Sequence, residues 1–200
     1  AIPTLTRNHT SIFLKYRDRN MLIDCGEGTQ RQMRKAKISP SKITDILITH
    51  FHGDHIFGLP GLLHTLSQVN YNKVLNIYIP RNTKKFIKKM FDFAGIKIPV
   101  RIAEVKNKVI ETKDFKITAF PLKHDIPCNG YRFEEKDKLR IKKEKFENLI
   151  KNLKINSKDL NKISSILKRK NIRINKKVLR WNDLTYVEKG KKIGFVLDTE

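Results

Sequence analysis

Short apolar runs, rich in β-branched and aromatic residues, recur along the chain at the length of β-strands. Each run is bounded by Gly, Pro, Asn or charged residues, which is typical of strands in a folded domain. The predicted strands are SIFLKY (11–16), MLIDC (21–25), DILIT (45–49), LNIYI (75–79), VRIAEV (100–105), FKITAF (115–120) and IGFVL (193–197). Between the first two, RDRN (17–20) predicts a hairpin turn.

Segments with helical character separate several of these strands. TQRQMRKAK (29–37) follows two glycines, and GLLHTLSQV (61–69) follows Pro60. TKKFIKKMFDFAG (83–95) begins with a Thr that can cap the helix and ends with Gly. Strands interleaved with helices favour a layered α/β domain.

The pattern changes from Glu134 onward. KFENLIKNLKI (145–155) and KDLNKISSILKRK (158–170) carry apolar residues at helical spacing on a basic background, and no strand-like run returns until about Val178. We therefore expect one domain over residues 1–200, with an insertion at 136–180 that projects from it.

Positive charge is concentrated in this insertion. It holds 17 basic and four acidic residues, in a chain whose formal net charge is +23. A field of this sign attracts polyanions, chiefly nucleic acid or an anionic membrane surface. A solvated helical hairpin without function is the alternative.

Length and composition exclude several classes of protein. Two hundred residues with 39% hydrophobic content can build one sizeable core. No apolar run approaches the roughly 20 residues that span a bilayer, so no membrane partner is expected. The first residues lack a signal-peptide pattern, and two cysteines are too few for a disulfide framework. We expect a cytoplasmic protein.

Three of the six histidines fall within ITHFHGDHIFGLPGLL (48–63). A neutral imidazole is the commonest metal ligand near neutral pH. His50 ends a predicted strand, and His52 can project to the same side, while Gly53 permits a turn that lets Asp54 and His55 face a neighbouring position. One zinc takes only about four ligands, so these donors, with others from elsewhere, suggest two metals.

Distant segments repeat the pattern of an apolar strand followed by a ligand. His124 follows FKITAF, Asp198 follows IGFVL, and Asp24 lies at the end of MLIDC. Any one of them alone would be explained as a polar residue at a strand end, but the set together predicts a metal site. The remaining histidines and both cysteines are expected to be structural: His9, His64, Cys25 and Cys128.

THFHGDH (49–55) fits the His-x-His-x-Asp-His signature of metallo-β-lactamase-fold hydrolases. Within that superfamily, DCGEGTQRQM (24–33), residues 39–63, HDIPCNGYRFEE (124–135) and IGFVLDTE (193–200) resemble ribonuclease Z, the family of tRNA 3′-processing endonucleases. DCGEGTQRQ together with GLPGLL is the more specific part. The resemblance implies an α/β fold, the metallo-β-lactamase αββα sandwich, with a protruding basic arm.

The resemblance also implies a role for each candidate residue. His50, His52 and His124 would hold one zinc and Asp54 and His55 a second, with Asp198 bridging the two Zn²⁺ ions of each subunit. Asp54 would in addition accept a proton, and Asp24 would orient a ligand histidine. Zinc lowers the pKa of bound water to about 7, and two metals can stabilise both oxygens of an in-line displacement at phosphorus.

The implied reaction is cleavage of precursor tRNA on the 3′ side of the discriminator base by metal-activated water. In the resembled family the arm of one subunit serves the site of its partner, so we expect a homodimer. Contacts with tRNA are expected at Arg7 and Asn8, in a PTLTRN loop where some members have Lys instead of Leu5. Further contacts are expected in the arm at Lys168, Arg169, Lys170, Arg173, Lys176 and Lys177.

Family members begin with a strand and a Gly-Thr turn before the PTxxRN segment. They continue past the Asp-Thr of VLDTE to a His-Glu-Ala-Thr or similar motif and a last zinc-ligating histidine. We therefore expect that both ends are missing here and that the second zinc site is incomplete. Two other functions stay open: a metallo-β-lactamase-fold phosphodiesterase for small esters, and a catalytically incomplete RNA-binding remnant.

Overall fold

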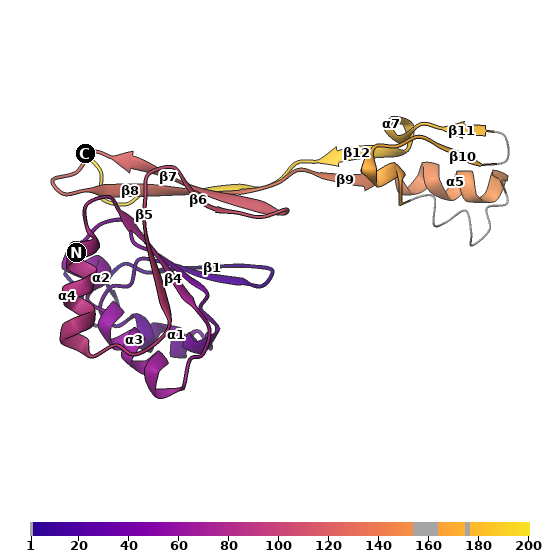
Figure 1. The fold of residues 1–200 in the computed structure, drawn as a ribbon. Helices are drawn as coiled ribbons and strands as arrows, with labels where there is room; N and C mark the ends of the chain where they lie inside the picture. The colour runs from indigo at the N-terminus through magenta and orange to yellow at the C-terminus, as the bar shows by residue number, and fades with distance from the viewer. Residues whose placement is uncertain (1, 154–163, 175–176) are drawn as a thin grey trace. The chain divides into compact units, whose positions relative to one another are not determined.

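The computed structural model describes residues 2–153, 164–174 and 177–200 (Figure 1). The chain divides into two compact units. The first unit comprises residues 1–112, 116–133 and 193–200, and the second comprises 113–115 and 134–192. Among the described residues, no helix combines the length and the apolar character needed to cross a bilayer.

The first unit contains a five-stranded sheet. Its strands, in spatial order, are β1 (Ile12–Tyr16), β2 (Arg19–Ile23), β3 (Asp45–Leu47), β4 (Leu75–Pro80) and β5 (Val100–Val105). β1 and β2 are antiparallel with Tyr16 opposite Arg19, which confirms the predicted hairpin, with a turn shortened to Arg17 and Asp18. The later strands are parallel to one another.

Helices cover one face of this sheet. They are α1 (Thr29–Lys35), the 3₁₀ turn η1 (Pro40–Lys42), α2 (Gly53–Ile56), α3 (Leu59–Gln68) and α4 (Lys84–Ala94). Leu22, Ile46 and Ile77 alternate along their strands so that they meet Leu62 and Leu66 of α3 in one buried core. The three helices that were predicted for this region are thus confirmed, with ends that differ by a few residues.

A second sheet supplies the next layer. Its strands, in spatial order, are β13 (Lys192–Phe195), β8 (Cys128–Glu135), β7 (Phe115–Leu122) and β6 (Lys108–Glu111). All seven predicted strands are present, but β6 and β8 were not predicted. CNGYRFEE, the sequence of β8, mixes Asn, Gly and acidic residues and shows no apolar run, although Tyr131 and Phe133 are buried.

One side chain and one backbone N–H of β8 join the two sheets. The Tyr131 hydroxyl donates a hydrogen bond to the carbonyl oxygen of Ile48, 2.6 Å away, and the backbone N–H of Asn129 donates to the carbonyl oxygen of Thr49, 2.8 Å away. Both acceptors lie directly before His50. The segment that leads into His50 and His52 is therefore held by contacts with both sheets.

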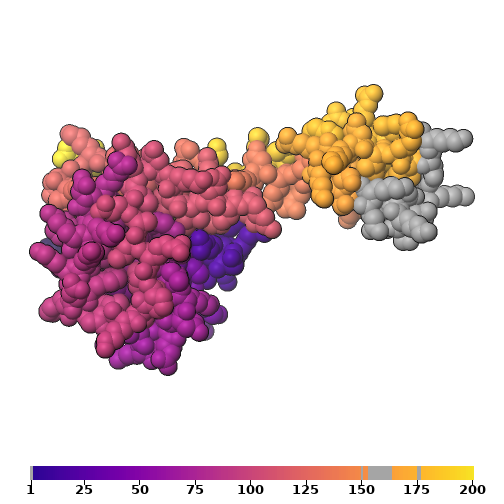
Figure 2. Space-filling model, viewed as in Figure 1, coloured from indigo at the N-terminus to yellow at the C-terminus, as the bar shows by residue number. Residues whose placement is uncertain are grey.

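The second unit has a core of its own. Its elements are β9 (Lys138–Ile141), α5 (Lys143–Leu153), the 3₁₀ turn η2 (Ile166–Lys168), β10 (Ile172–Ile174), β11 (Lys177–Leu179), α7 (Trp181–Leu184) and β12 (Thr185–Glu188). Ile166, Ile172, Ile174, Leu179 and Leu184 form its buried cluster. Figure 2 shows the atoms of β10, β11 and α7, in orange, packed into one compact body.

The prediction that no strand returns before about Val178 is wrong. β9 pairs with β12, and β10 pairs with β11, both antiparallel. β9 (KLRI) and β10 (IRI) are four and three residues long and alternate isoleucine or leucine with basic residues, so they lack an apolar run. Of the predicted helix over 158–170, residues 158–163 lie outside the described residues and 166–168 form a 3₁₀ turn.

We expect that Tyr131→Phe lowers the free energy of unfolding by about 1–3 kcal/mol, because a fully buried carbonyl loses its donor. Tyr186→Phe, at a half-exposed ring, is the control and should change stability little. Urea denaturation of both variants measures the difference. Equal stabilities would show that the Tyr131 hydroxyl contributes nothing to the joining of the sheets.

Candidate metal centre

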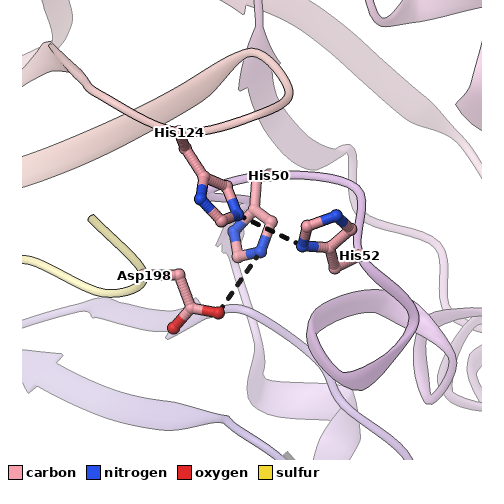
Figure 3. Close-up of side chains that lie close together, drawn as sticks. All are labelled: His50, His52, His124 and Asp198. Carbon is pink, nitrogen blue, oxygen red and sulfur yellow. Dashed lines mark hydrogen bonds and ion pairs between the residues drawn. The ribbon is translucent and has the colours of Figure 1, made fainter. Parts of the chain in front are cut away.

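Four candidate ligands from separate parts of the sequence converge at one place (Figure 3). His50 and His52 follow β3, His124 follows β7, and Asp198 follows β13. Each offers one ligand atom, and all four atoms lie within 4.8 Å of one another. The ends of strands from both sheets thus bring these side chains together.

The geometry of this group suits a zinc ion. His124 Nε2 lies 3.2 Å from His52 Nδ1, and His50 Nε2 lies 3.7 Å from Asp198 Oδ2. His50 is fully buried, and its Nε2 has no hydrogen-bond partner within the part of the chain that the structure describes. A buried polar atom without a partner needs a physical reason, and a metal supplies one. Three imidazoles and a carboxylate match the ligands that zinc takes.

A second group adjoins the first. His55 Nε2 lies 3.2 Å from Asp198 Oδ2 and 3.7 Å from Asp54 Oδ2. The three side chains could hold another cation. Because the same oxygen of Asp198 faces both His50 and His55, this carboxylate lies where a bridge between two metals would be.

Asp24 organises the histidines from behind. Its fully buried carboxylate follows β2 and accepts hydrogen bonds from the backbone N–H of Thr49 (2.7 Å), from the Thr49 hydroxyl (2.7 Å) and from His55 Nδ1 (2.6 Å). With Nδ1 engaged in this way, His55 presents Nε2 to the other candidate ligands. Such carboxylate–histidine pairs are the usual support of metal ligands.

Thr49 links Asp24 to His50 through hydrogen bonds and so orients the His50 ring as well. Its hydroxyl donates to Asp24, so the hydroxyl oxygen is left to accept a hydrogen bond from His50 Nδ1, 3.0 Å away. A ring that carries its proton on Nδ1 has its lone pair on Nε2, which is the atom at the metal group. One buried carboxylate therefore sets the tautomer of two histidines.

The protonation of the two rings follows from their surroundings. Burial, together with repulsion from His55, lowers the pKa of His50 to about 4, so this ring is neutral at pH 7. For His55, burial disfavours the charged ring, but the hydrogen bond with Asp24 and the nearby carboxylates outweigh it and raise its pKa above the usual value. A neutral His50 is ready to act as a ligand.

Close backbone approach holds these loops together. The N–H of Cys25 donates to the carbonyl of His55 (2.7 Å), and the N–H of Gly58 donates to the carbonyl of Cys25 (2.9 Å). A Cβ atom on Gly58 would lie 2.0 Å from the carbonyl oxygen of Gly26, so only glycine fits there. The loop that contains Asp24 is thereby pressed against the turn that contains His55.

Two polar residues at the site were not predicted. Thr49 is the last residue of a predicted apolar strand, and its full burial does not follow from its residue type. The Asp125 carboxylate lies 3.4 Å from His52 Nε2 and 3.1 Å from His124 Nε2. In the sequence, only the position of Asp125 directly after the candidate ligand His124 indicates its place at the site.

The other candidates are not among the grouped ligand atoms, although Cys128 Sγ lies 3.8 Å from the carbonyl oxygen of Asp198. His64 is on α3, and its Nε2 lies 3.3 Å from Gln68 Nε2. Burial raises the pKa of the Cys25 thiol to about 12. Arg7 and Asn8 are exposed. The described basic residues of the predicted arm are exposed in the second unit, and Lys176 lies outside the described residues: Lys168, Arg169, Lys170, Arg173 and Lys177.

A helix layer, two sheets and a histidine–aspartate cluster at their strand ends define a protein of the metallo-β-lactamase fold. The family model described as Anti-Pycsar protein Apyc1 matches residues 3–126, and the chain belongs to this family. Human tRNase Z, short form, is a structural neighbour with a TM-score of 0.61 and 31% identity, over 68% of this chain and 61% of that one. A diphosphatase from the PhnP family follows with a TM-score of 0.54 and 26% identity, over 64% and 49%. The expected fold class is confirmed.

Curated relatives support the resemblance stated from the sequence. Ribonuclease Z of Nanoarchaeum equitans is 39% identical over 99% of this chain, and ribonuclease Z of Methanococcus maripaludis is 37% identical over 100% of this chain. The chain spans 61% and 65% of the length of these two relatives. The resemblance to ribonuclease Z is therefore confirmed at the level of homology.

We expect that Asp24→Ala weakens zinc binding roughly 10- to 100-fold, as the loss of such a support commonly does. Asp45→Ala is a matched control, because Asp45 is a fully buried carboxylate of the same sheet that contacts Thr44, Asn76 and Arg19 instead of the cluster. Competition with a chromogenic chelator measures the affinity. If both variants lose zinc equally, Asp24 acts only on the stability of the fold.

Proposed function

We propose that the chain carries the metal centre of an endoribonuclease that cleaves precursor tRNA on the 3′ side of the discriminator base. The observation that supports this most is the pair of adjoining ligand groups that share Asp198 Oδ2, in a chain homologous to ribonuclease Z along almost its full length. Two cations held side by side suit displacement at phosphorus.

Two Zn²⁺ ions would be held as follows. His50, His52 and His124 would be the ligands of one, Asp54 and His55 would belong to the other, and Asp198 would contribute to both. When bound, such ions supply a hydroxide at neutral pH and an electrophilic environment for the phosphate. The second group offers fewer protein ligands here than zinc usually takes.

The chain's own residues do the remaining work. Asp54 stands at the edge of its group, with its carboxylate 18% exposed, so it is accessible to water and to substrate. A carboxylate in this position can take the proton of the attacking water and hold it for the leaving oxygen. Asp24 and Thr49 keep His50 and His55 in the tautomer and orientation that the site requires.

Binding of the tRNA body is assigned to the basic surface of the second unit. Residues 136–180 hold 17 basic and four acidic residues. Phosphate contacts supply most of the affinity for nucleic acid and do not depend on base sequence. Arg169 is held over the Trp181 ring, 5.6 Å from its centroid, so at least one of the cations is placed by the core of this unit. We propose a homodimer in which this surface serves the partner's site.

A phosphodiesterase for small esters is the second candidate. The family match covers residues 3–126 and ends before the second unit's segment 134–192, and a diphosphatase is among the structural neighbours. Turnover of small phosphodiesters without cleavage of precursor tRNA would favour this function. An RNA-binding remnant would instead retain tRNA affinity with about one zinc per chain.

We expect that Asp54→Ala reduces cleavage of precursor tRNA by at least about 100-fold, the size of a general acid–base contribution, while tRNA binding changes little. Asp92→Ala, at an exposed carboxylate of α4, is the control and should leave both unchanged. Single-turnover cleavage and filter binding measure the two effects. Equal loss of binding and cleavage would show that Asp54 does not act in the chemical step.

We expect that neutralising the six basic residues of the arm weakens tRNA binding and flattens its dependence on salt, because fewer counterions are released. The six are Lys168, Arg169, Lys170, Arg173, Lys176 and Lys177. Hydrolysis of a small phosphodiester should be unaffected. Binding isotherms at several salt concentrations test this.

A matched control neutralises six exposed basic residues of the first unit. These are Arg34, Lys35, Lys37, Lys42, Lys73 and Lys97. The control lowers the net charge by the same amount. If it flattens the salt dependence as strongly as the arm variant does, only the overall charge matters and the arm is a solvated surface.

A further inference from the structure

An apolar hollow of about 420 Å³ lies beside the candidate metal centre, and no role assigned so far uses it. Phe51, Ile56, Phe86, Met90, Ile126 and Pro127 supply its apolar lining. The hollow belongs entirely to the first unit. It is large enough for a small ring system and too small for a helix of a protein partner.

Two aromatic rings stand in the wall of the hollow. The ring centroids of Phe51 and Phe86 are 5.7 Å apart and the rings are inclined by 35°. Phe86 is 48% exposed, so part of its ring is open to solvent. Exposed aromatic rings at nucleic-acid sites serve as surfaces on which unstacked bases stack.

The hollow borders the metal group through one shared residue. His52 lines it, and His52 Nδ1 is 3.2 Å from His124 Nε2. His124 in turn lines a second, more polar hollow of about 400 Å³, to which Arg81 and Lys106 contribute. Ile126 and Pro127 belong to the walls of both hollows. A phosphate at the metal group would therefore lie close to an apolar hollow and to a polar one that contains Arg81 and Lys106.

The helix that supplies Phe86 and Met90 is basic. Lys84, Lys85, Lys88 and Lys89 are exposed on α4, and Lys85 Nζ lies 5.3 Å from the centroid of the Phe86 ring. An apolar pocket bordered by lysines complements a nucleotide, whose base is apolar on its faces and whose phosphates are anionic. The same charges do not favour a purely apolar ligand.

We propose that this hollow is a base subsite, which takes the unstacked nucleobase of a nucleotide next to the scissile phosphodiester bond. The proposal rests on the proposed function and deepens it, because it assigns residues that hold a base at the reaction site. Phe51 and Phe86 stack on the base, and Ile56, Met90 and Ile126 close around its edge.

The first experiment needs no cleavage. Methyl-labelled, zinc-loaded protein is titrated with adenosine 5′-monophosphate and, in parallel, with ribose 5-phosphate, which lacks the base. We expect the methyl signals of Ile56, Met90 and Ile126 to shift with the nucleotide and to shift much less with the sugar phosphate. Equal shifts with both ligands, or none with the nucleotide, would overturn the proposal.

A matched pair of variants locates the stacking surface. Phe86→Ala should weaken binding of the nucleotide roughly 5- to 100-fold, the range measured for loss of one aromatic–base stack. Phe93→Ala, on the same helix but 93% exposed and outside the hollow, should leave it unchanged. Phe86→Trp, which keeps an aromatic face, should restore binding. Unchanged affinity in Phe86→Ala would contradict the assignment.

The second experiment places the base in the substrate. Precursor tRNAs that lack the base on either the 5′ or the 3′ side of the cleaved bond are compared with the intact substrate. Wild-type protein should cleave one of them roughly 5- to 100-fold more slowly. Phe86→Ala should cleave all three at similar, reduced rates. The position that matters identifies which base enters the hollow.

The two experiments separate the subsite from the proposed function. If the nucleotide binds in the hollow but no precursor tRNA is cleaved, the base subsite stands and the endoribonuclease assignment fails. If precursor tRNA is cleaved while neither missing base affects the rate and the nucleotide leaves the three methyl signals unshifted, the endoribonuclease stands and the subsite fails.

Discussion

The hydrogen bonds of the buried Asp24 carboxylate are the constraint on which the site depends. They tie the end of β2 to Thr49 and to His55, and through the Thr49 hydroxyl they reach His50. Asp24 has a φ of 57°, in the left-handed region, where aspartate is among the residues that tolerate the conformation. A buried carboxylate is costly unless several donors satisfy it, and here three do so. The hydrogen bonds that stabilise this buried carboxylate therefore also orient the imidazoles of His50 and His55 toward the candidate metal centre.

The two sheets share the task of holding the candidate ligands. The first sheet contributes the segment of His50 and His52, while the second contributes His124 and Asp198 from the residues that follow β7 and β13. The hydrogen bonds from Tyr131 and Asn129 to the segment before His50 fix the first set relative to the second. Each of these candidate ligands follows shortly after the end of a strand, so the strands position it.

Much of this architecture could be predicted from the chain because its signals are local. Apolar strands with a histidine or aspartate shortly after them predict both the strands and the candidate ligands, and Asp198 and His124 were predicted in this way. β8 could not be predicted in this way. Its Asn129, Gly130 and Glu134 are buried because of contacts with the rest of the fold, and their residue types do not indicate burial. The position of Asp125 between His52 and His124 depends on how two sheets meet, which no local pattern records. β9 and β10 are too short and too basic to stand out before their partners are known.

The second unit leaves and rejoins the rest of the chain through adjacent strands. β9 and β12 run antiparallel, and the backbone N–H of Glu135 donates to the carbonyl of Lys191, 2.8 Å away. The chain therefore enters and leaves the second unit at two positions one strand spacing apart, whatever the length of the segment between β9 and β12. The entropic cost of closing this segment depends only weakly on its length. The segment between β9 and β12 can accordingly be lengthened, shortened or changed in charge without altering the residues of the candidate metal centre.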